Sequence, residues 1–180
     1  MIRHIALGGV SGAGKSTLLN RLLKETSLPV YGFKTKLHRD SLTDKGNHPV
    51  YIYPVCSGPA EYTESEKNLV GEVSRGTHIV YSEVFETLGV DYLSNIPERG
   101  IIVMDELGFL ESGSVPFQNA VFAAFAKITP VIAVVKERYD IDFLNKIRAL
   151  PGLDLYTVTE ENREELFHEL APIIRSWNQD

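Results

Sequence analysis

The stretch GGVSGAGKST, residues 8–17, follows a short apolar run and decides the fold of this 180-residue chain. Gly9, Gly14, Lys15 and Ser16 satisfy the Walker A pattern G-x-x-x-x-G-K-[ST]. Glycines at these positions let successive backbone N–H groups point inward, where they bind an anion. The helix expected to begin near Lys15 aims its positive dipole end at the same place. The stretch therefore predicts a phosphate-binding loop.

The side chains of this loop have expected tasks. Lys15 reaches the β- and γ-phosphates, Ser16 ligates Mg²⁺, and Thr17 adds a phosphate contact. The residues expected to bind the nucleotide here are Gly9, Val10, Ser11, Gly12, Ala13, Gly14, Lys15, Ser16 and Thr17. The context that the pattern demands, a strand before it and a helix after it, argues against a chance match. We therefore expect Mg²⁺ together with ATP or another nucleoside triphosphate.

Two acids follow the apolar run IIVM at residues 101–104. An acid at the end of a neighbouring strand holds the metal and its water shell, so Asp105 is the expected Walker B acid. Glu106 is expected to take a proton from a water aligned with the γ-phosphate. Its alternative role is a solvated acid or a partner for Lys or Arg. The pair predicts the second half of a metal-nucleotide site.

Two cations leave the next apolar run, PVIAVV, at residues 130–135. Lys136 or Arg138 could stabilise charge on the transferred phosphoryl group, as an arginine finger does. We name Arg138 as the candidate catalytic cation, against an equal alternative of a plain surface charge. The guanine-reading pattern N-K-x-D would stand here, and the chain has KERYD instead, which argues against a strict GTPase.

Strands alternate with helices along the chain, which is typical of a largely parallel α/β sheet. Residues 29–37 and 49–55 are rich in Val and Tyr and predict an antiparallel hairpin added at one edge. Residues 56–77 show no clear period and are expected to be loop with at most one short strand. Ser114 and Asp140 are expected to cap helices. We expect one domain over the whole chain, 1–180, with a three-layer P-loop NTPase fold of class α/β.

Composition excludes several classes of protein. Hydrophobic residues make up 43% and charged residues 23%, as in soluble globular proteins, and the net charge of −6 argues against a dedicated nucleic-acid binder. Cys56 is the only cysteine, so no internal disulfide forms, which fits a reducing cytoplasm. No apolar segment approaches the roughly 20 residues that span a bilayer. We expect a cytoplasmic protein with no nucleic-acid or membrane partner.

Several pieces, in order, resemble the small THEP-type P-loop nucleoside-triphosphatases. They are GGVSGAGKSTLL (8–19), VYGFKTKLHRD (30–40), VYSEVFETLGV (80–90), MDELGFLE (104–111), PVIAVVKER (130–138) and PGLDLYTVTEENREEL (151–166). The P-loop is shared by many families. The D-E-[IL]-G block and the T-x-E-N-R start together are much more specific.

The resemblance implies Mg²⁺-dependent hydrolysis of nucleoside triphosphates with loose base preference on one P-loop α/β domain. It implies phosphate and Mg²⁺ binding by residues 9–17, metal binding by Asp105 and a general base at Glu106. It also implies that Asn162 and Arg163 lie near the nucleotide base, although the start of a helix suits them structurally as well.

The chain departs from the family at three positions. Phe109 and Lys136 stand where the family often has Lys and His, and Ser11 replaces a frequent proline. The first two departures remove polar groups close to the expected γ-phosphate. They bear on hydrolysis and the natural substrate and leave nucleotide binding untouched.

The favoured function is a nucleoside-triphosphate phosphatase in which Glu106 activates water. Two alternatives stay open: a kinase that passes the γ-phosphoryl group to a nucleotide or small metabolite, and a slow nucleotide-gated adaptor. A kinase needs a mobile lid that carries cations, and residues 36–48 or 56–77 could form one, although neither has a dense Arg pattern. The sequence names no protein partner and no phosphoryl acceptor.

Overall fold

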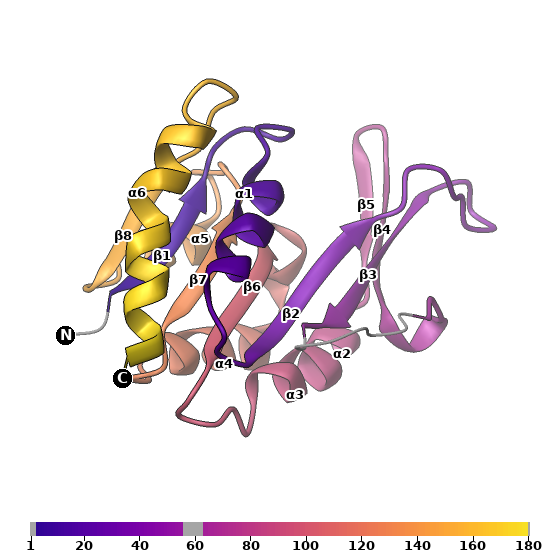
Figure 1. The fold of residues 1–180 in the computed structure, drawn as a ribbon. Helices are drawn as coiled ribbons and strands as arrows, with labels where there is room; N and C mark the ends of the chain where they lie inside the picture. The colour runs from indigo at the N-terminus through magenta and orange to yellow at the C-terminus, as the bar shows by residue number, and fades with distance from the viewer. Residues whose placement is uncertain (1–2, 56–62, 180) are drawn as a thin grey trace.

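A computed structural model describes residues 3–55 and 63–179, and in this part of the chain eight strands form one sheet (Figure 1). The strands are β1 (His4–Gly8), β2 (Val30–Leu37), β3 (His48–Pro54), β4 (Leu69–Ser74), β5 (Thr77–Val80), β6 (Ile101–Leu107), β7 (Val131–Val135) and β8 (Leu153–Thr157). The helices are α1 (Lys15–Leu22), α2 (Ser82–Val84), α3 (Val90–Leu93), α4 (Val115–Phe125), α5 (Asp142–Arg148) and α6 (Arg163–Ser176). A π-helical turn, Phe85–Gly89, joins α2 to α3.

The strand order is β5-β4-β3-β2-β6-β7-β1-β8. Strands β2, β6, β7, β1 and β8 run parallel, whereas β3, β4 and β5 are antiparallel to their neighbours. The carboxyl ends of the five parallel strands therefore meet at one edge of the sheet, where open α/β sheets bind their ligands. This arrangement confirms the mostly parallel sheet with an antiparallel addition.

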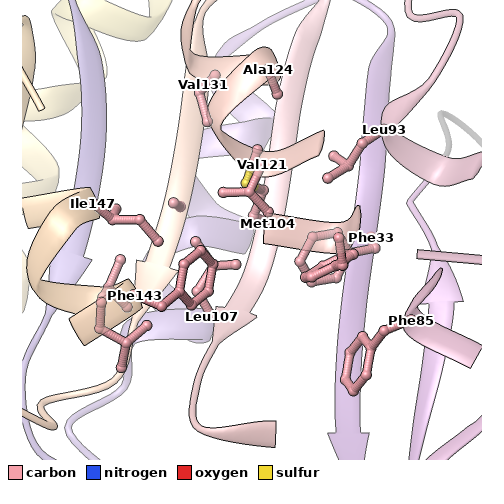
Figure 2. Packing of buried hydrophobic residues seen from close by; sticks show 14 of the residues in the cluster. Phe33, Phe85, Leu93, Met104, Leu107, Val121, Ala124, Val131, Phe143 and Ile147 are labelled. Atoms are coloured by element: carbon pink, nitrogen blue, oxygen red, sulfur yellow. The ribbon is translucent and has the colours of Figure 1, made fainter. Parts of the chain in front are cut away.

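Helices cover both faces of the sheet (Figure 1). Side chains alternate along β6: Ile102 and Met104 join the core beneath α4 and α5, while Ile101 and Val103 join the core beneath α1 and α6. Both sets are fully buried, which explains why the strand reads as a continuous apolar run. Figure 2 shows Val121 of α4 packed in the same layer as Met104. The three-layer prediction is confirmed.

The antiparallel part is larger than one hairpin. The predicted pair is present as β2 and β3, but β4 and β5 extend it, with Gly76 in the turn between them at a φ of 79°. The sequence pattern hid β4 because two of its three buried central residues are Gly71 and Glu72, which interrupt the apolar alternation. Cys56 and the rest of residues 56–62 lie outside the described residues.

The two predicted caps have different outcomes. Ser114 is the N-cap of α4 and its side chain accepts a hydrogen bond from the N–H of Phe117, as expected. Asp140 is not the N-cap of α5, because that helix begins at Asp142 and its N-cap is Ile141. The Asp140 carboxylate binds Arg138 instead. Among the residues that the structure describes, none of the helices combines the length and apolarity that crossing a bilayer requires.

Candidate active site

The phosphate loop joins the carboxyl end of β1 to the start of α1. Gly9 has a φ of 123° and Gly14 a φ of 89°, a region that favours glycine. Space demands glycine as well at Gly9, where a Cβ would lie 2.4 Å from the carbonyl oxygen of Val158. A Cβ at Gly14 would lie 2.6 Å from Nη1 of Arg163, so the Arg163 side chain packs against the loop. The connection from β8 to α6 therefore packs directly on the loop.

Lys15 lies over the loop that precedes it. Its Nζ donates hydrogen bonds to the carbonyl oxygens of Gly9 and Val10, both at 2.8 Å, and the residue is 6% exposed. The ammonium is thus held inside the curve of the backbone, where the pattern expects phosphate. An ammonium in this place supplies a fixed positive charge.

The loop encloses a cavity of about 330 Å³, which we call the phosphate cavity. It is lined by Ser11, Gly12, Gly14, Lys15, Ser16, Thr17 and Glu106. Six of the nine loop residues expected to bind nucleotide therefore face it. Glu106 reaches it from β6, which brings the predicted base to the predicted phosphate site.

Asp105 meets Ser16 across the boundary between the phosphate loop and β6. The Ser16 hydroxyl donates a hydrogen bond to Oδ1 of Asp105 at 2.9 Å, although the two residues are 89 positions apart in the chain. Burial raises the pKa of Asp105 to about 6, and the Ser16 hydrogen bond opposes that rise. A carboxylate oxygen and a hydroxyl oxygen placed together in this way are both suitable ligands for a divalent cation.

These two oxygen ligands fit Mg²⁺. That ion is held in nucleotide sites by one or two protein oxygens, with water and phosphate oxygens completing its shell. Among the described residues no group of three His, Cys, Asp or Glu side chains could hold a metal by itself, so an ion here would depend on the nucleotide for ligands. The predicted metal residues, Ser16 and Asp105, lie together as this role requires.

Glu106 is held from two sides. Its carboxylate forms an ion pair with Lys136, with 3.1 Å between Oε1 and Nζ. Its backbone N–H donates to Oγ1 of Thr35 on β2 at 3.4 Å. The peptide bond between Asp105 and Glu106 is cis. The alternative role predicted for Glu106, a partner for a lysine, is thus present in the same side chain that lines the phosphate cavity.

Arg138 does not join this group. Its guanidinium forms a bidentate pair with Asp140, at 2.8 and 2.6 Å, and it is not among the residues that line the phosphate cavity. The charged pair raises the pKa of Arg138 and lowers that of Asp140 to about 2. A catalytic role for Arg138 stays a prediction.

Asn162 and Arg163 lie where β8 leads into α6. The Asn162 side chain accepts a hydrogen bond from the Thr159 N–H at 2.8 Å and donates one to the Thr157 carbonyl at 2.9 Å. Both ends of its amide therefore close the turn before α6. The Arg163 side chain packs next to Gly14 of the phosphate loop. Their predicted place near the nucleotide base is not tested by these contacts.

A second, smaller cavity adjoins the site and contains residues that the motifs did not single out. Its volume is about 120 Å³, and its lining includes Thr35, Glu106, Phe109, Glu111 and Lys136. Glu111 is 2% exposed and accepts the Gly108 N–H at 3.0 Å. Burial raises the pKa of Glu111 to about 7. The only sequence signal for Glu111 is its place at the end of the block MDELGFLE.

A family model and two curated proteins match most of this chain. A family model described as NTPase matches residues 4–171. The nucleoside-triphosphatase THEP1 of Methanocaldococcus jannaschii is 31% identical over 171 residues, which cover 93% of this chain and 94% of that protein. A cancer-related nucleoside-triphosphatase homolog of Mus musculus is 29% identical over 191 residues, 98% of each chain.

A solved structure shares the architecture. The crystal structure of THEP1 from the hyperthermophile Aquifex aeolicus matches with a TM-score of 0.69 and 22% identity, and the match covers 95% of this chain and 98% of that one. At this identity the likeness carries the fold alone. The predicted P-loop α/β fold is confirmed.

Proposed function

Since the chain belongs to the NTPase family, we propose that it hydrolyses the γ-phosphate of ATP, GTP and other nucleoside triphosphates, with Mg²⁺ and loose base preference. The resemblance to THEP-type nucleoside-triphosphatases is confirmed by the family match and by the relatives. One observation carries the proposal: Glu106 lines the same cavity as Lys15 and Ser16, beside the contact between Ser16 and Asp105.

Residues of the phosphate loop bind and orient the triphosphate. The backbone N–H groups of the loop and the start of α1 attract the phosphates, and Lys15 exchanges its bonds to the loop carbonyls for phosphate oxygens. Ser16 and Asp105 would hold Mg²⁺, which would supply positive charge to the phosphates. These groups place the γ-phosphoryl group toward Glu106.

Glu106 then acts on the attacking water. As the bond between the water oxygen and the γ-phosphorus forms, the bond from that phosphorus to the β,γ-bridging oxygen breaks. The water's proton passes to the Glu106 carboxylate and is later released, and the products are the nucleoside diphosphate and inorganic phosphate. No phosphoryl acceptor other than water enters this reaction.

Loose base preference is supported by the lining of the phosphate cavity and by the structural use of Asn162. Its amide oxygen and its amide nitrogen each form one hydrogen bond within the turn before α6, which is the structural role expected at the start of a helix. The residues lining the phosphate cavity address phosphates rather than a base. Recognition of the triphosphate with little recognition of the base is the result we expect.

A kinase is less well supported because one candidate lid, residues 36–48, is bound to strand β4. Thr43, Lys45 and Asn47 of the β2–β3 loop all bind the carboxylate of Glu72 on β4. A loop held in this way lies against the antiparallel end of the sheet. The other candidate segment includes residues outside the described part of the chain.

The test is phosphate release from ATP, GTP, CTP and UTP with Mg²⁺ and no acceptor. We expect release with all four nucleotides, loss of release when the metal is chelated, and loss in Lys15→Ala. Glu106→Gln should bind ADP normally and lose about 10²-fold or more in kcat, since a general base contributes about 10²–10⁴-fold.

The matched control is Glu165→Gln, which makes the same chemical change at an exposed position of α6. It should keep the wild-type rate. Tight ATP binding by the wild type without phosphate release would overturn the proposed function. An unchanged rate in Glu106→Gln would overturn the role of Glu106.

A further inference from the structure

We infer that Lys136 is a catalytic cation of this site, whose ammonium orients Glu106 and stabilises charge on the γ-phosphoryl group as it is transferred. The inference rests on the proposed hydrolysis and deepens it. From the sequence, either Lys136 or Arg138 could supply such a charge, and Arg138 was the residue named as the candidate; Lys136 was also a departure from the family pattern. The structure separates the two.

Lys136 is placed by the sheet. It directly follows β7, and its backbone N–H donates to the carbonyl oxygen of Leu107 on β6 at 2.9 Å. β6 and β7 are parallel neighbours (Figure 1), so Lys136 leaves the sheet at the same carboxyl edge as Asp105 and Glu106. Its backbone is further held by Arg148, which donates to the Lys136 carbonyl oxygen.

The Lys136 ammonium contacts Glu106, which itself lines the phosphate cavity. Nζ of Lys136 is 3.1 Å from Oε1 of Glu106, and Glu106 lines both the phosphate cavity and the smaller cavity that Lys136 lines. An ammonium has three N–H donors, so one ion pair does not exhaust it. The side chains are 39% and 26% exposed, so water screens the pair only in part.

The surroundings of Lys136 form a cradle for its stem. A Cβ at Gly108 would lie 3.2 Å from Cδ of Lys136, so the glycine leaves the room in which the stem lies. The Phe109 ring lies 5.3 Å from Nζ, within reach of a cation–π interaction. The Glu111 carboxylate accepts a hydrogen bond from the Gly108 N–H. Residues of the block MDELGFLE thus orient the Lys136 side chain, and the same block contains Asp105 and Glu106.

Arg138 also lies near the Phe109 ring, with its Cζ 5.6 Å from the ring centroid, but its charged group is paired away from the site. Both its contacts with Asp140 are short, the pair is exposed, and it lies outside the cavity lining. Its charge is neutralised locally by Asp140. The cation that can meet developing negative charge is therefore the one already in contact with the base.

A cation that acts on the transferring group stabilises the transition state more than the bound substrate. Lys136→Met should therefore lower kcat by about 10²-fold, as the loss of one such contact does. The Kd for ADP should stay within about twofold, because ADP has no γ-phosphoryl group. The complex of ADP with aluminium fluoride, which imitates the transferring group, should be lost.

The experiment compares Lys136→Met, Lys136→Arg and Arg138→Met in the full-length protein. Lys146→Met is the matched control, since Lys146 is an exposed lysine paired only across one turn with Asp142 in the contacts observed. We expect partial recovery of kcat in Lys136→Arg, wild-type kcat in Lys146→Met, and an unchanged melting temperature in Lys136→Met. That pattern distinguishes a catalytic charge from a structural one.

Wild-type kcat in Lys136→Met, or a loss confined to KM and ADP binding, would overturn the inference and leave the proposed function standing. A loss of kcat in Arg138→Met with none in Lys136→Met would also overturn it. Absence of phosphate release from the wild type would instead overturn the proposed function and this inference together.

Discussion

Replacing Glu72 by glutamine tests whether the charge of this carboxylate stabilises the contact between the β2–β3 loop and strand β4. The Glu72 carboxylate is buried and accepts hydrogen bonds from Thr43 at 2.8 Å, Asn47 at 3.0 Å and Lys45 at 3.3 Å, as well as one from the Tyr81 hydroxyl. A neutral amide keeps the shape of this side chain but loses the charge that these donors face. Glu72→Gln should therefore destabilise the protein.

The size of the effect follows from the pKa of Glu72. The Tyr81 hydrogen bond, with those from Asn47, Thr43 and Lys45, lowers this pKa from 4.5 to about 2. At about 1.4 kcal/mol per pKa unit, the folded state prefers the carboxylate by at most about 3.5 kcal/mol. The groove beside Glu72 admits water, so we expect about 2 kcal/mol at pH 7.

The sign with pH is fixed by the direction of the shift. Because the pKa is lower in the folded state, the stabilisation is complete above about pH 5 and is lost as the pH falls toward 2. The difference in unfolding free energy between wild type and Glu72→Gln should therefore shrink by more than half from pH 7 to pH 3.

The assay is urea denaturation of both proteins at pH 7 and pH 3, with Glu83→Gln as the control. Glu83 is exposed on the rim of the same groove, so its replacement should change the unfolding free energy by less than about 0.5 kcal/mol. A difference between wild type and Glu72→Gln that is the same at both pH values would refute the reasoning, because it would not come from the charge.

Two further predictions concern the site itself. Gly9→Ala forces a Cβ to within 2.4 Å of the Val158 carbonyl oxygen at a φ of 123°, so ATP affinity in equilibrium binding should fall more than about tenfold. Gly46→Ala, at a positive φ with open space around it, should bind ATP normally, and equal affinities in the two variants would contradict the argument. Asn162→Ala removes hydrogen bonds of the turn before α6 and should cost about 1–2 kcal/mol in thermal unfolding. The ratio of ATP to GTP turnover should not move, and a changed ratio would show that Asn162 reads the base.

Much of the fold was predictable because its signals are local. The apolar runs of β6 and β7 predict strands buried on both faces, and the alternation of strands with helices predicts their parallel order. The sequence allowed one short strand in residues 56–77 but could not locate β4, because its buried positions include Gly71 and Glu72. The buried Glu72 carboxylate is satisfied by the hydroxyl of Tyr81, nine residues away, and by donors of the β2–β3 loop, which are 25 to 29 residues away in the sequence.

Some residues of the candidate site could likewise be predicted from local sequence signals, and others could not. Residues 9–17 could be recognised from the sequence because a phosphate loop depends on glycine conformations and on a helix start, both set by adjacent residues. Asp105 and Glu106 could be recognised because a polar pair at the end of an apolar strand is a local pattern. Thr35 and Glu111 could not, since their positions against Glu106 and Gly108 depend on neighbouring strands and a folded turn.

The sequence by itself determined that this chain holds a triphosphate on a P-loop α/β fold, because glycine geometry and apolar periodicity act over a few residues. Only the tertiary structure decided which distant side chains meet. Ser16 reaches Asp105 because β6 lies in the same sheet as β1. Lys136 pairs with Glu106, whereas Arg138 pairs with Asp140. Electrostatic contacts between strands depend on distances of a few ångströms, which packing sets and a local pattern does not contain.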